Sequence, residues 1–382
     1  MSENILEVDD EDGEPMESIY AASQYPAIPV LYRVDRVDAA TINSSSRSLY
    51  EEELDYVMEN GRRYCGDYIF PNDVTEQDRL RVVHQVFWNV FKEKLTSVPL
   101  EDPTYILDIG TGTGEWAIGM AEDFPSCEVV GVDISAIQPT AVPYNVFFEV
   151  DDCEVEWMRP EDTVDLVHLR DMAGAFADWD FIFREALSCL KPGGYIECLD
   201  FHDQTGQTQN FLSSFPVDAR IHEFARAIDE ASIKAGRRRG THHLEAERLE
   251  RLGFIDVKIS EHAFPLNARN DYVAKIWLVA CLYTVEAGSL RLLTKYLEWD
   301  PDRAREMCKE VCQEIKERAM DPSVSPNSLN ISLRVLTARK PTAEEQAERI
   351  GGNDADLLTI DSTENGHAPG DGYSGDESTI GA

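Results

Sequence analysis

A glycine-rich turn that follows an apolar run and opens a helical pattern is the clearest chemical signal in the sequence. The segment Asp108–Gly114 reads DIGTGTG, with G-x-G-x-G spacing. A dinucleotide-binding fingerprint requires G-x-G-x-x-G, and Glu115 takes the position of its third glycine. A carboxylate at the start of a helix repels a pyrophosphate, so this turn disfavours NAD and FAD. The turn is compatible with S-adenosylmethionine (SAM), which carries no phosphate and has positive sulfonium and amino groups.

Two further carboxylates end the next apolar runs, and both fit an adenosine-containing cofactor. Asp133 follows the run VVGV, where a carboxylate can accept hydrogen bonds from both ribose hydroxyls and would repel the 2′-phosphate of NADP. Asp152 follows the run Val146–Val150 and can accept from the adenine amino group, while the backbone N–H of Cys153 meets a ring nitrogen. Because the carboxyl ends of parallel strands meet in one crevice, we expect these segments to form a single SAM site.

The residues predicted to bind SAM lie in the glycine-rich turn, at the two carboxylates that follow it, and at the end of a fourth apolar run. They are Asp108, Gly110, Thr111, Gly112, Gly114, Asp133, Ile134, Asp152, Cys153 and Arg170. Arg170 is expected to bind the carboxylate of the cofactor or an acidic acceptor. A structural salt bridge with Asp165 or Asp171 is the alternative.

The catalytic requirements of methyl transfer are modest. Displacement at an activated sulfonium needs proximity and orientation, and a general base is required only if the acceptor must lose a proton. His202 is the best-placed candidate base, with a surface-turn histidine as the alternative. His168 lies inside an apolar run and is expected to be a core residue. The eight cysteines show no metal-ligand spacing, so no metal site is predicted.

The elements that must position these residues alternate along the chain. From residue 105, short apolar runs and helical patterns follow one another, which predicts a doubly wound α/β fold with a mostly parallel sheet. The expected strands are Tyr105–Ile109, Glu128–Asp133, Val146–Val150, Val164–Leu169, Tyr195–Leu199 and Phe254–Glu261, with Ser328–Thr337 as an antiparallel edge strand. The expected helices are Leu49–Asn60, a helix from Asn72 or Thr75 to Leu95, Glu115–Asp123, Asp180–Leu190 and Phe211–Gly236.

Composition and these elements together predict five regions. A helical cap is expected at 46–100, a SAM-binding core at 101–205, and the rest of the methyltransferase domain at 206–340. Two or three helices in 270–320 form an insertion before the last strand and a candidate lid. Acidic tails are expected at 1–45 and 341–382, where too few large apolar residues are present to offset the entropy of ordering.

The charge pattern excludes several classes of function. A formal net charge of −37 disfavours direct nucleic-acid binding. The basic run at 234–243 (KAGRRRGTHH) is expected to be a solvated turn, with a partner-docking loop as the alternative. The apolar run Ile276–Val285 is too short to span a bilayer, so no membrane association is expected. Reduced thiols favour a cytoplasmic protein, with the nucleus as the alternative.

Several segments resemble the LaeA-like methyltransferases of filamentous fungi, over roughly residues 50–340. The most particular are NGRRY at 60–64 and DISAIQP at 133–139, beside PNDVTEQDRL at 71–80 and LKPGGYIE at 190–197. The resemblance implies that the cofactor positions of the wider fold are matched by Gly110, Gly112, Gly114, Asp133 and Asp152. The family often has histidine after the tyrosine of NGRRY, where this chain has Cys65.

The resemblance implies two kinds of function. Members of the family include enzymes of secondary-metabolite pathways and a regulator that acts with velvet-type proteins in the nucleus. The leading prediction is a SAM-dependent methyltransferase with a small-molecule acceptor in fungal secondary metabolism. The alternative is a regulatory protein that uses the same fold to bind a protein partner.

Arg62, Arg63 and Tyr64 are expected either to fold over the cofactor or to be structural.

Overall fold

The computed structural model describes residues 55–201, 209–266, 272–324 and 329–349. The expected N-terminal tail and the candidate base His202 lie outside the described residues, as does 350–382 of the expected C-terminal tail. The chain divides into two units, Met1–Lys340 and Pro341–Ala382.

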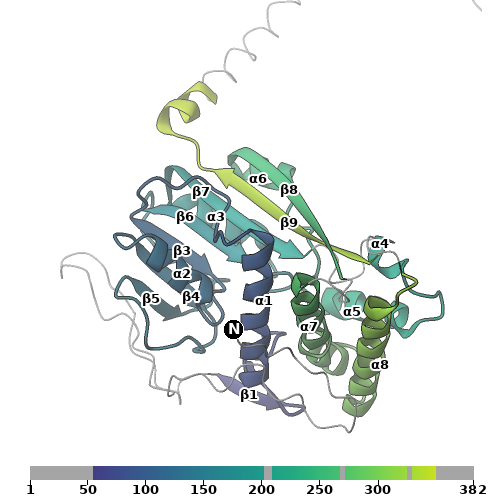
Figure 1. Cartoon of the computed structure of the whole chain (residues 1–382). Helices are drawn as coiled ribbons and strands as arrows, with labels where there is room; N and C mark the ends of the chain where they lie inside the picture. The colour runs from purple at the N-terminus through teal and green to yellow at the C-terminus, as the bar shows by residue number, and fades with distance from the viewer. Residues whose placement is uncertain (1–54, 202–208, 267–271, 325–328, 350–382) are drawn as a thin grey trace, which may run out of the picture. The chain divides into compact units, whose positions relative to one another are not determined.

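A seven-stranded sheet lies at the centre of the first unit, in the order β5-β4-β3-β6-β7-β9-β8 (Figure 1). Its strands are β3 (Tyr105–Ile109), β4 (Glu128–Asp133), β5 (Val146–Val150), β6 (Val164–Arg170), β7 (Leu190–Phe201), β8 (Ile255–Pro265) and β9 (Asn330–Arg339). The strands from β3 to β7 run parallel, and β9 pairs antiparallel with both β7 and β8. The predicted doubly wound, mostly parallel fold is therefore confirmed.

One strand position differs from the prediction. The strand expected at Ser328–Thr337 forms as β9, but it is hydrogen-bonded on both sides, and β8 occupies the edge of the sheet. Alternation of apolar and polar residues correctly predicted a strand. It could not show how many partners the strand has, because pairing depends on where the neighbouring strands lie.

Helices cover both faces of the sheet, as a doubly wound fold requires. On one face, α2 (Glu115–Asp123) buries Trp116 and Met120 against Ile106 of β3. On the other face, α3 (Trp179–Cys189) and α6 (Ala246–Leu252) pack against Leu107 and its neighbours. Adjacent residues of β3 point to opposite faces, and both are fully buried, which explains why these strands read as continuous apolar runs.

A hairpin replaces the helix predicted at Leu49–Asn60. Within the part of this segment that the structure describes, β1 (Tyr56–Glu59) pairs with β2 (Arg62–Cys65). The two residues between them, Asn60 and Gly61, have φ of 50° and 73°. Two positive φ values in a two-residue loop are those of a type I′ turn, for which Asn-Gly is the preferred sequence. The sequence thus contained the hairpin signal.

Helix α1 (Val74–Val90) follows the hairpin and is shorter than predicted. Asp73 begins it by accepting a hydrogen bond from the Glu76 N–H at 3.1 Å. The helix ends at Val90, before the expected Leu95, and Lys92 and Glu93 adopt φ of 54° and 65°. Those backbone angles are incompatible with a right-handed helix, so the chain turns away well before the prolines at 99 and 103.

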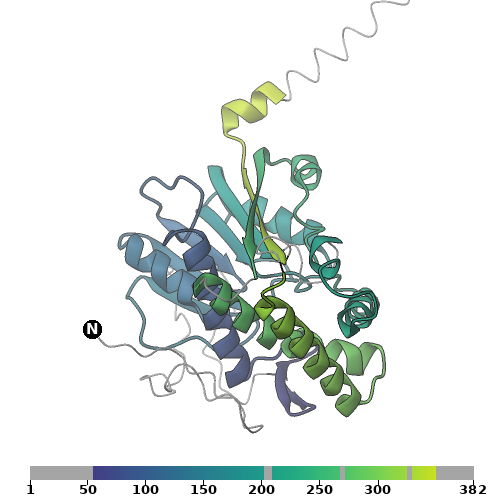
Figure 2. The same ribbon diagram turned by 45° about the vertical axis from the view of Figure 1, so that its right-hand side comes forward.

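The remaining helices pack together beside α1 (Figures 1 and 2). The helix expected at Phe211–Gly236 is broken into α4 (Gln209–Leu212) and α5 (Arg220–Lys234), with Pro216 between them. The insertion before the last strand consists of α7 (Tyr272–Ala287), the π-helical η2 (Leu292–Tyr296) and α8 (Pro301–Met320). The stretch Tyr272–Tyr296 is long and apolar enough to span a membrane, but 56% of its most apolar window is buried in the protein, which is typical of a core helix.

The second unit, considered by itself, contains a short helix at 343–349 within the tail that was predicted to be disordered. Thr342 accepts a hydrogen bond from the Glu345 N–H at 3.3 Å, and Glu345 accepts one from the Thr342 N–H at 2.8 Å. This reciprocal pair is a capping box, a local signal that outweighs the acidic composition here.

Candidate functional site

A cavity of about 230 Å³ lies where the carboxyl ends of β3, β4, β5 and β6 meet. Its walls include seven of the predicted cofactor residues, namely Gly110, Gly112, Asp133, Ile134, Asp152, Cys153 and Arg170. Three others, Asp108, Thr111 and Gly114, do not line it. The crevice outside the carboxyl ends of parallel strands is where open α/β sheets bind ligands, so this cavity is the candidate cofactor site.

The glycine-rich turn brings its backbone close to other groups, and only glycine permits that approach. Gly110 has φ of 71°, and a Cβ there would meet the Met172 thioether closer than 3.0 Å. Gly114 has φ of 84° and precedes α2, and a Cβ there would collide with the Phe148 ring. The turn therefore presents bare backbone to the cavity at Gly110 and Gly112, which lets a ligand approach closely.

Asp133 is held in place by two backbone groups. One of its carboxylate oxygens accepts from the Gly112 N–H at 2.8 Å, and the other accepts from the Ser135 N–H at 2.9 Å. Each oxygen retains a second lone pair for a ligand hydroxyl. Burial raises the pKa of Asp133 to about 6, against the lowering effect of these two hydrogen bonds. Asp133 is thus an oriented acceptor beside the glycine turn.

The third strand end completes the part of the site predicted for adenine. Asp152 accepts from the Glu154 N–H at 2.9 Å, and its own N–H donates to Asp151 at 2.9 Å. Cys153 follows, and burial raises the pKa of its thiol well above the usual range. Asp151, Asp152, Cys153 and Ile134 all line the cavity, so acceptors and apolar surface lie together at this end.

Arg170 lies at the wall of the cavity and forms neither of the salt bridges considered for it. Asp165 pairs with Lys191 at 2.7 Å, and Asp171 pairs with Arg79 at 3.3 Å. The Arg170 guanidinium instead donates to His84 Nδ1 at 3.2 Å and stacks 4.7 Å from the centre of the Phe87 ring. Burial and the Arg170 charge lower the pKa of His84 to about 3, so His84 is a neutral acceptor.

Asp108 and Thr111 belong to the glycine-rich turn but do not line the cavity, and their side chains anchor the turn to the sheet. Asp108 and His168 are register partners on β3 and β6, and the Asp108 carboxylate lies 2.7 Å from His168 Nδ1. The other carboxylate oxygen accepts from the Thr111 hydroxyl at 2.7 Å. The His168 ring stacks on Trp116 with centroids 3.6 Å apart. His168 is the core residue that was expected, and the Asp108–His168–Trp116 group holds the turn.

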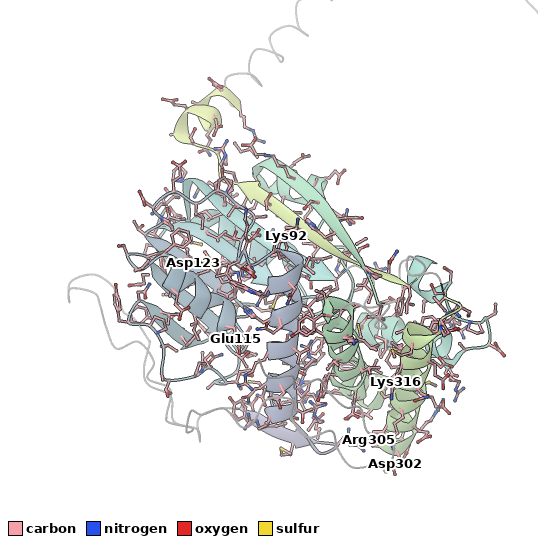
Figure 3. The ribbon with its side chains drawn as sticks, in the orientation of Figure 1. Lys92, Glu115, Asp123, Asp302, Arg305 and Lys316 are labelled. Atoms are coloured by element: carbon pink, nitrogen blue, oxygen red, sulfur yellow. The ribbon has the colours of Figure 1, made fainter. Side chains whose placement is uncertain are left out.

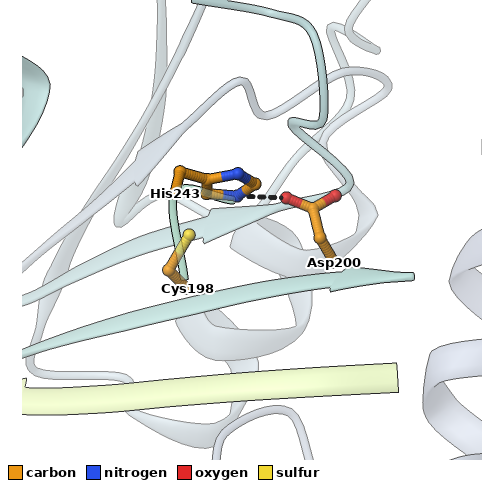
Figure 4. Close-up of side chains that lie close together, drawn as sticks. All are labelled: Cys198, Asp200 and His243. Atoms are coloured by element: carbon orange, nitrogen blue, oxygen red, sulfur yellow. Dashed lines mark hydrogen bonds and ion pairs between the residues drawn. The ribbon is translucent and has the colours of Figure 1, made fainter. Parts of the chain in front are cut away.

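A second group of the same composition lies at the end of β7 (Figure 4). Asp200 Oδ2 lies 2.8 Å from His243 Nε2. The His243 ring also stacks on Trp179, with centroids 3.8 Å apart. Asp200 also accepts from the Ala173 N–H at 3.1 Å, in the loop that follows β6. Burial raises the pKa of Asp200 well above its usual range and lowers that of His243 to about 3, so the pair is neutral overall.

The second group also contains Cys198, whose sulfur lies within 4.8 Å of the other two ligand atoms. These three side chains are the set that comes close enough to hold a metal ion among the described residues. Asp200 and His243 already bind each other, and a structural zinc site has four ligands. The arrangement is therefore explained by the hydrogen bond without an ion.

The segment that covers the cavity was not assigned to the site by sequence reasoning. Phe70, Glu76 and Arg79 line the cavity from the hairpin exit and α1. Arg79 is buried, donates to Glu76 at 2.8 Å, and pairs with Asp171 across the cavity wall. Asp171 has φ of 58°, an unusual backbone conformation that clusters at functional sites. The signal was the family-like segment PNDVTEQDRL, which includes Glu76 and Arg79.

The NGRRY residues are structural in this molecule. Arg62 pairs with Asp73 at 2.6 Å, Arg63 donates to Asn72 at 2.7 Å, and Tyr64 is buried; none of the three lines the cavity. Cys65 donates its thiol hydrogen to the Ile134 carbonyl at 3.1 Å. The residue that departs from the family pattern thus supports the loop after Asp133.

The basic run at 234–243 is not the solvated turn that was predicted. Arg239 and His243 are buried, and Arg237 lines the cavity and forms an ion pair with Glu154. Arg238 remains exposed. The error arose because composition alone does not show that acceptors from distant elements surround these cations.

The charge of the cavity fits a cationic cofactor. Its lining contains seven carboxylates and three guanidinium groups, and Arg79 and Arg237 are paired within it. Glu115 lies at the start of α2 (Figure 3), outside the lining, and pairs with Arg81 at 3.4 Å. A net negative lining stabilises a sulfonium and an ammonium group and repels phosphates. Together with the oriented Asp133 and the bare glycine backbone, these residues fit SAM.

Comparisons with known proteins agree with this geometry. Residues 82–249 match the family model described as "Methyltransferase domain". Methyltransferase pytC of Aspergillus terreus is 33% identical over 70% of this chain and 85% of its own length. The secondary metabolism regulator LAE1 of Cochliobolus heterostrophus is 31% identical over 64% of this chain and 83% of its own length.

One solved structure is similar to part of this chain. The Haemonchus contortus phosphoethanolamine N-methyltransferase 2 structure, a complex with S-adenosylhomocysteine, aligns over 72% of this chain and 62% of that one. Its TM-score is 0.41 at 19% identity.

Proposed function

The chain belongs to the LaeA-like family of SAM-dependent methyltransferases, and from this premise we propose that it methylates a small-molecule acceptor in fungal secondary metabolism. The observation that carries the proposal is Asp133, fixed by two backbone N–H groups beside an open glycine backbone in a net acidic cavity. The similarity to a methyltransferase of comparable length supports an enzymatic role.

We assign roles in donor binding from the positions of the side chains. Asp133 would accept from the ribose hydroxyls, and Asp152 with the Cys153 backbone would bind adenine. Arg170 would bind the carboxylate of the methionine part, since its partner His84 is neutral and leaves the guanidinium charge available. The carboxylates of the lining would stabilise the cationic groups of the donor.

The bound donor supplies a methyl group that is already activated. The protein then contributes proximity, orientation and exclusion of water, which for well-oriented reactants are worth about 7–11 kcal/mol of the barrier. Phe70 and the Glu76–Arg79–Asp171 ion pairs form the cavity wall on the α1 side, where they would shield the donor from water.

A regulatory role is the second candidate function, and the similarity to proteins named secondary metabolism regulators supports it. The sequence argument for a protein partner was the basic run that contains Arg237 and Arg239. Arg237 and Arg239 are engaged inside the protein, so this argument is weakened. We therefore favour the enzyme, in the cytoplasm, with a nuclear location under the regulatory alternative and no direct nucleic-acid binding in either case.

The test is a calorimetric titration of the full chain with SAM and with NAD. We expect SAM to bind and NAD not to bind. Asp133→Ala removes hydrogen bonds to both ribose hydroxyls, so the affinity for SAM should fall by about 10–100-fold. The matched control is Asp123→Ala, an exposed carboxylate at the far end of α2 (Figure 3), which should leave affinity unchanged. A folded wild-type protein that does not bind SAM would contradict the proposal.

A further inference from the structure

Tyr68 lines the cofactor cavity from the loop between β2 and α1, and its hydroxyl group is available to a ligand. Two residues of the cavity lining carry a hydroxyl group, Tyr68 and Ser135. The Ser135 hydroxyl accepts a hydrogen bond from the Asn72 side-chain amide at 3.0 Å. The Tyr68 hydroxyl has no hydrogen-bond partner among the residues that the structure describes. A polar group in such a position is expected to bind the molecule that fills the cavity.

The rest of Tyr68 is firmly held. Its backbone N–H donates to the Cys65 carbonyl at 2.9 Å, and its own carbonyl accepts from the buried guanidinium of Arg291 at 2.6 Å. Its ring lies 6.0 Å from the Phe70 ring, centre to centre, and packs against the apolar cluster that contains Met172. The hydroxyl is therefore preorganised, which lowers the entropy that a ligand loses on binding to it.

The charged groups around Tyr68 show which part of the cavity its hydroxyl faces. Burial is the main cause that raises the pKa of this hydroxyl well above its ordinary 10. Asp133 raises it further, as do Asp171 and Glu76, whereas Arg237 lowers it. All four charged side chains line the same cavity. The phenol group thus lies inside the cavity and interacts with carboxylates at the ends of both β4 and β6.

These two strand ends are the places assigned to the two halves of the donor around its sulfur atom. Asp133 would bind the ribose, and Arg170, which directly precedes Asp171, would bind the carboxylate of the methionine part. In SAM, the sulfonium joins the ribose to the methionine chain. A hydroxyl group that interacts with both Asp133 and Asp171 is therefore expected to face the sulfonium.

A neutral phenol suits this position chemically. The positive sulfur polarises the hydrogens of its methyl group, so a nearby oxygen can accept C–H···O contacts from them. A phenolate in the same place would be a nucleophile and would become methylated itself. Burial and the neighbouring carboxylates keep the pKa of Tyr68 raised, so its hydroxyl stays neutral at physiological pH and does not compete with the acceptor.

We propose that Tyr68 is a further donor-binding residue, whose hydroxyl oxygen contacts the sulfonium methyl group and makes the site prefer SAM to S-adenosylhomocysteine. The inference rests on the proposed function and deepens it. After transfer, the donor has lost both its methyl group and its positive charge, so the contact with Tyr68 is lost as well. The preference therefore favours release of the product and binding of the next donor molecule.

The experiment is a calorimetric titration of the full chain with three ligands that differ at one position. SAM has a methyl group there, S-adenosylhomocysteine has none, and the analogue sinefungin has a charged amino group. Tyr68→Phe removes only the oxygen. We expect SAM affinity to fall about two- to fivefold, because C–H···O contacts are weak. Sinefungin affinity should fall about tenfold or more, since its amino group donates a charged hydrogen bond. The affinity for S-adenosylhomocysteine should stay unchanged.

The matched control is Tyr64→Phe. Tyr64 is a buried tyrosine of the neighbouring strand β2 and does not line the cavity, so removal of its hydroxyl should leave all three affinities unchanged. Thermal unfolding checks that both variants are folded.

Either of two results for a folded Tyr68→Phe protein would overturn the proposal. One is an equal loss of affinity for all three ligands, which would place the hydroxyl against a part of the donor that they share. The other is no loss for any of them. A folded wild-type protein that binds none of the three ligands would count against the proposed function instead, and this result is obtained before any variant is compared.

Discussion

The two buried Asp–His–Trp groups of this protein are similar in chemistry and different in origin. In both, an aspartate at the end of a sheet strand bonds a histidine whose ring stacks on a tryptophan. In the first group, Asp108 reaches the glycine turn through Thr111. In the second, Asp200 reaches the loop after β6 through the Ala173 N–H. Both groups thus support loops that line the cofactor cavity.

The difference lies in what brings each pair together. Asp108 and His168 are opposite each other in the register of β3 and β6, so parallel pairing alone makes them neighbours. His243 comes from the segment between α5 and α6 and reaches Asp200 only when that segment docks on the sheet. The first group is therefore a product of sheet register. The second depends on long-range packing and should be the one that stabilises the docked segment.

Removing the imidazole of the second group should have the largest effect on stability. His243→Ala leaves a fully buried Asp200 without its partner and a hollow beside Trp179, so the free energy of unfolding should fall by about 3–5 kcal/mol. Urea denaturation measures this. The control His262→Ala, at an exposed site, should change stability by less than about 0.5 kcal/mol. Equal effects of the two variants would show that the second group does not hold the segment.

The glycine turn held by the first group is also fixed by its own backbone, which a pair of glycine variants can test. Gly114→Ala combines a left-handed φ with a collision against Phe148 and should cost about 2–4 kcal/mol of unfolding free energy. Gly236→Ala has φ of 69° but meets nothing within 4 Å, so it should cost only about 1 kcal/mol. If thermal unfolding gives equal losses, packing against Phe148 does not constrain the turn.

Replacing each aspartate by isosteric asparagine tests whether Asp108 and Asp200 contribute differently to SAM binding. Asp108→Asn weakens the hydrogen bond that holds Thr111 within the glycine-rich turn, so SAM affinity should fall about tenfold, or ~1.4 kcal/mol. Asp200→Asn should change SAM affinity less, since it acts on the loop after β6. Calorimetry on both variants provides the measurement. A larger loss for Asp200→Asn would reverse the roles given to the two groups.

The pH dependence of SAM binding should follow the ionisation of Asp133. Asp133 lines the cavity, whereas Asp108 and Asp200 do not. Its pKa of about 6 lies above the ordinary 3.8, so the folded protein takes up a proton here as the pH falls through 6. Protonation removes an acceptor for the ribose, so affinity should fall by up to about tenfold per pH unit below 6 and stay constant above 7.

The raised pKa of Asp133 has the opposite effect on the stability of the ligand-free protein, which should increase as the pH falls. A carboxyl whose folded pKa is raised destabilises the fold at neutral pH, and that penalty disappears as the pH falls from 6 towards 4. Asp133→Asn should abolish both dependences. Titrations with SAM at several pH values, and unfolding curves without it, test the two signs independently.

Local sequence determined the centre of the molecule. The bounds of β3, β4, β5 and α2 agree with the predictions residue for residue, because apolar runs and helical periodicity report burial directly. The cavity at the strand ends also followed, since parallel strands place their carboxyl ends together. The Asn-Gly turn of the hairpin and the capping box at Thr342 were equally local signals, although composition obscured them.

Tertiary structure alone decided the rest. Three features depend on contacts between segments far apart in the chain. They are the position of β9 inside the sheet, the burial of particular cations of the basic run, and the contribution of Phe70 and Arg79 to the cavity lining. The burial and pairing of a side chain depend on residues that are distant in sequence, and a local sequence pattern does not identify those residues. His168 was placed by sheet register and read correctly as core, whereas His243 became the equivalent residue only because the fold brought Asp200 to it.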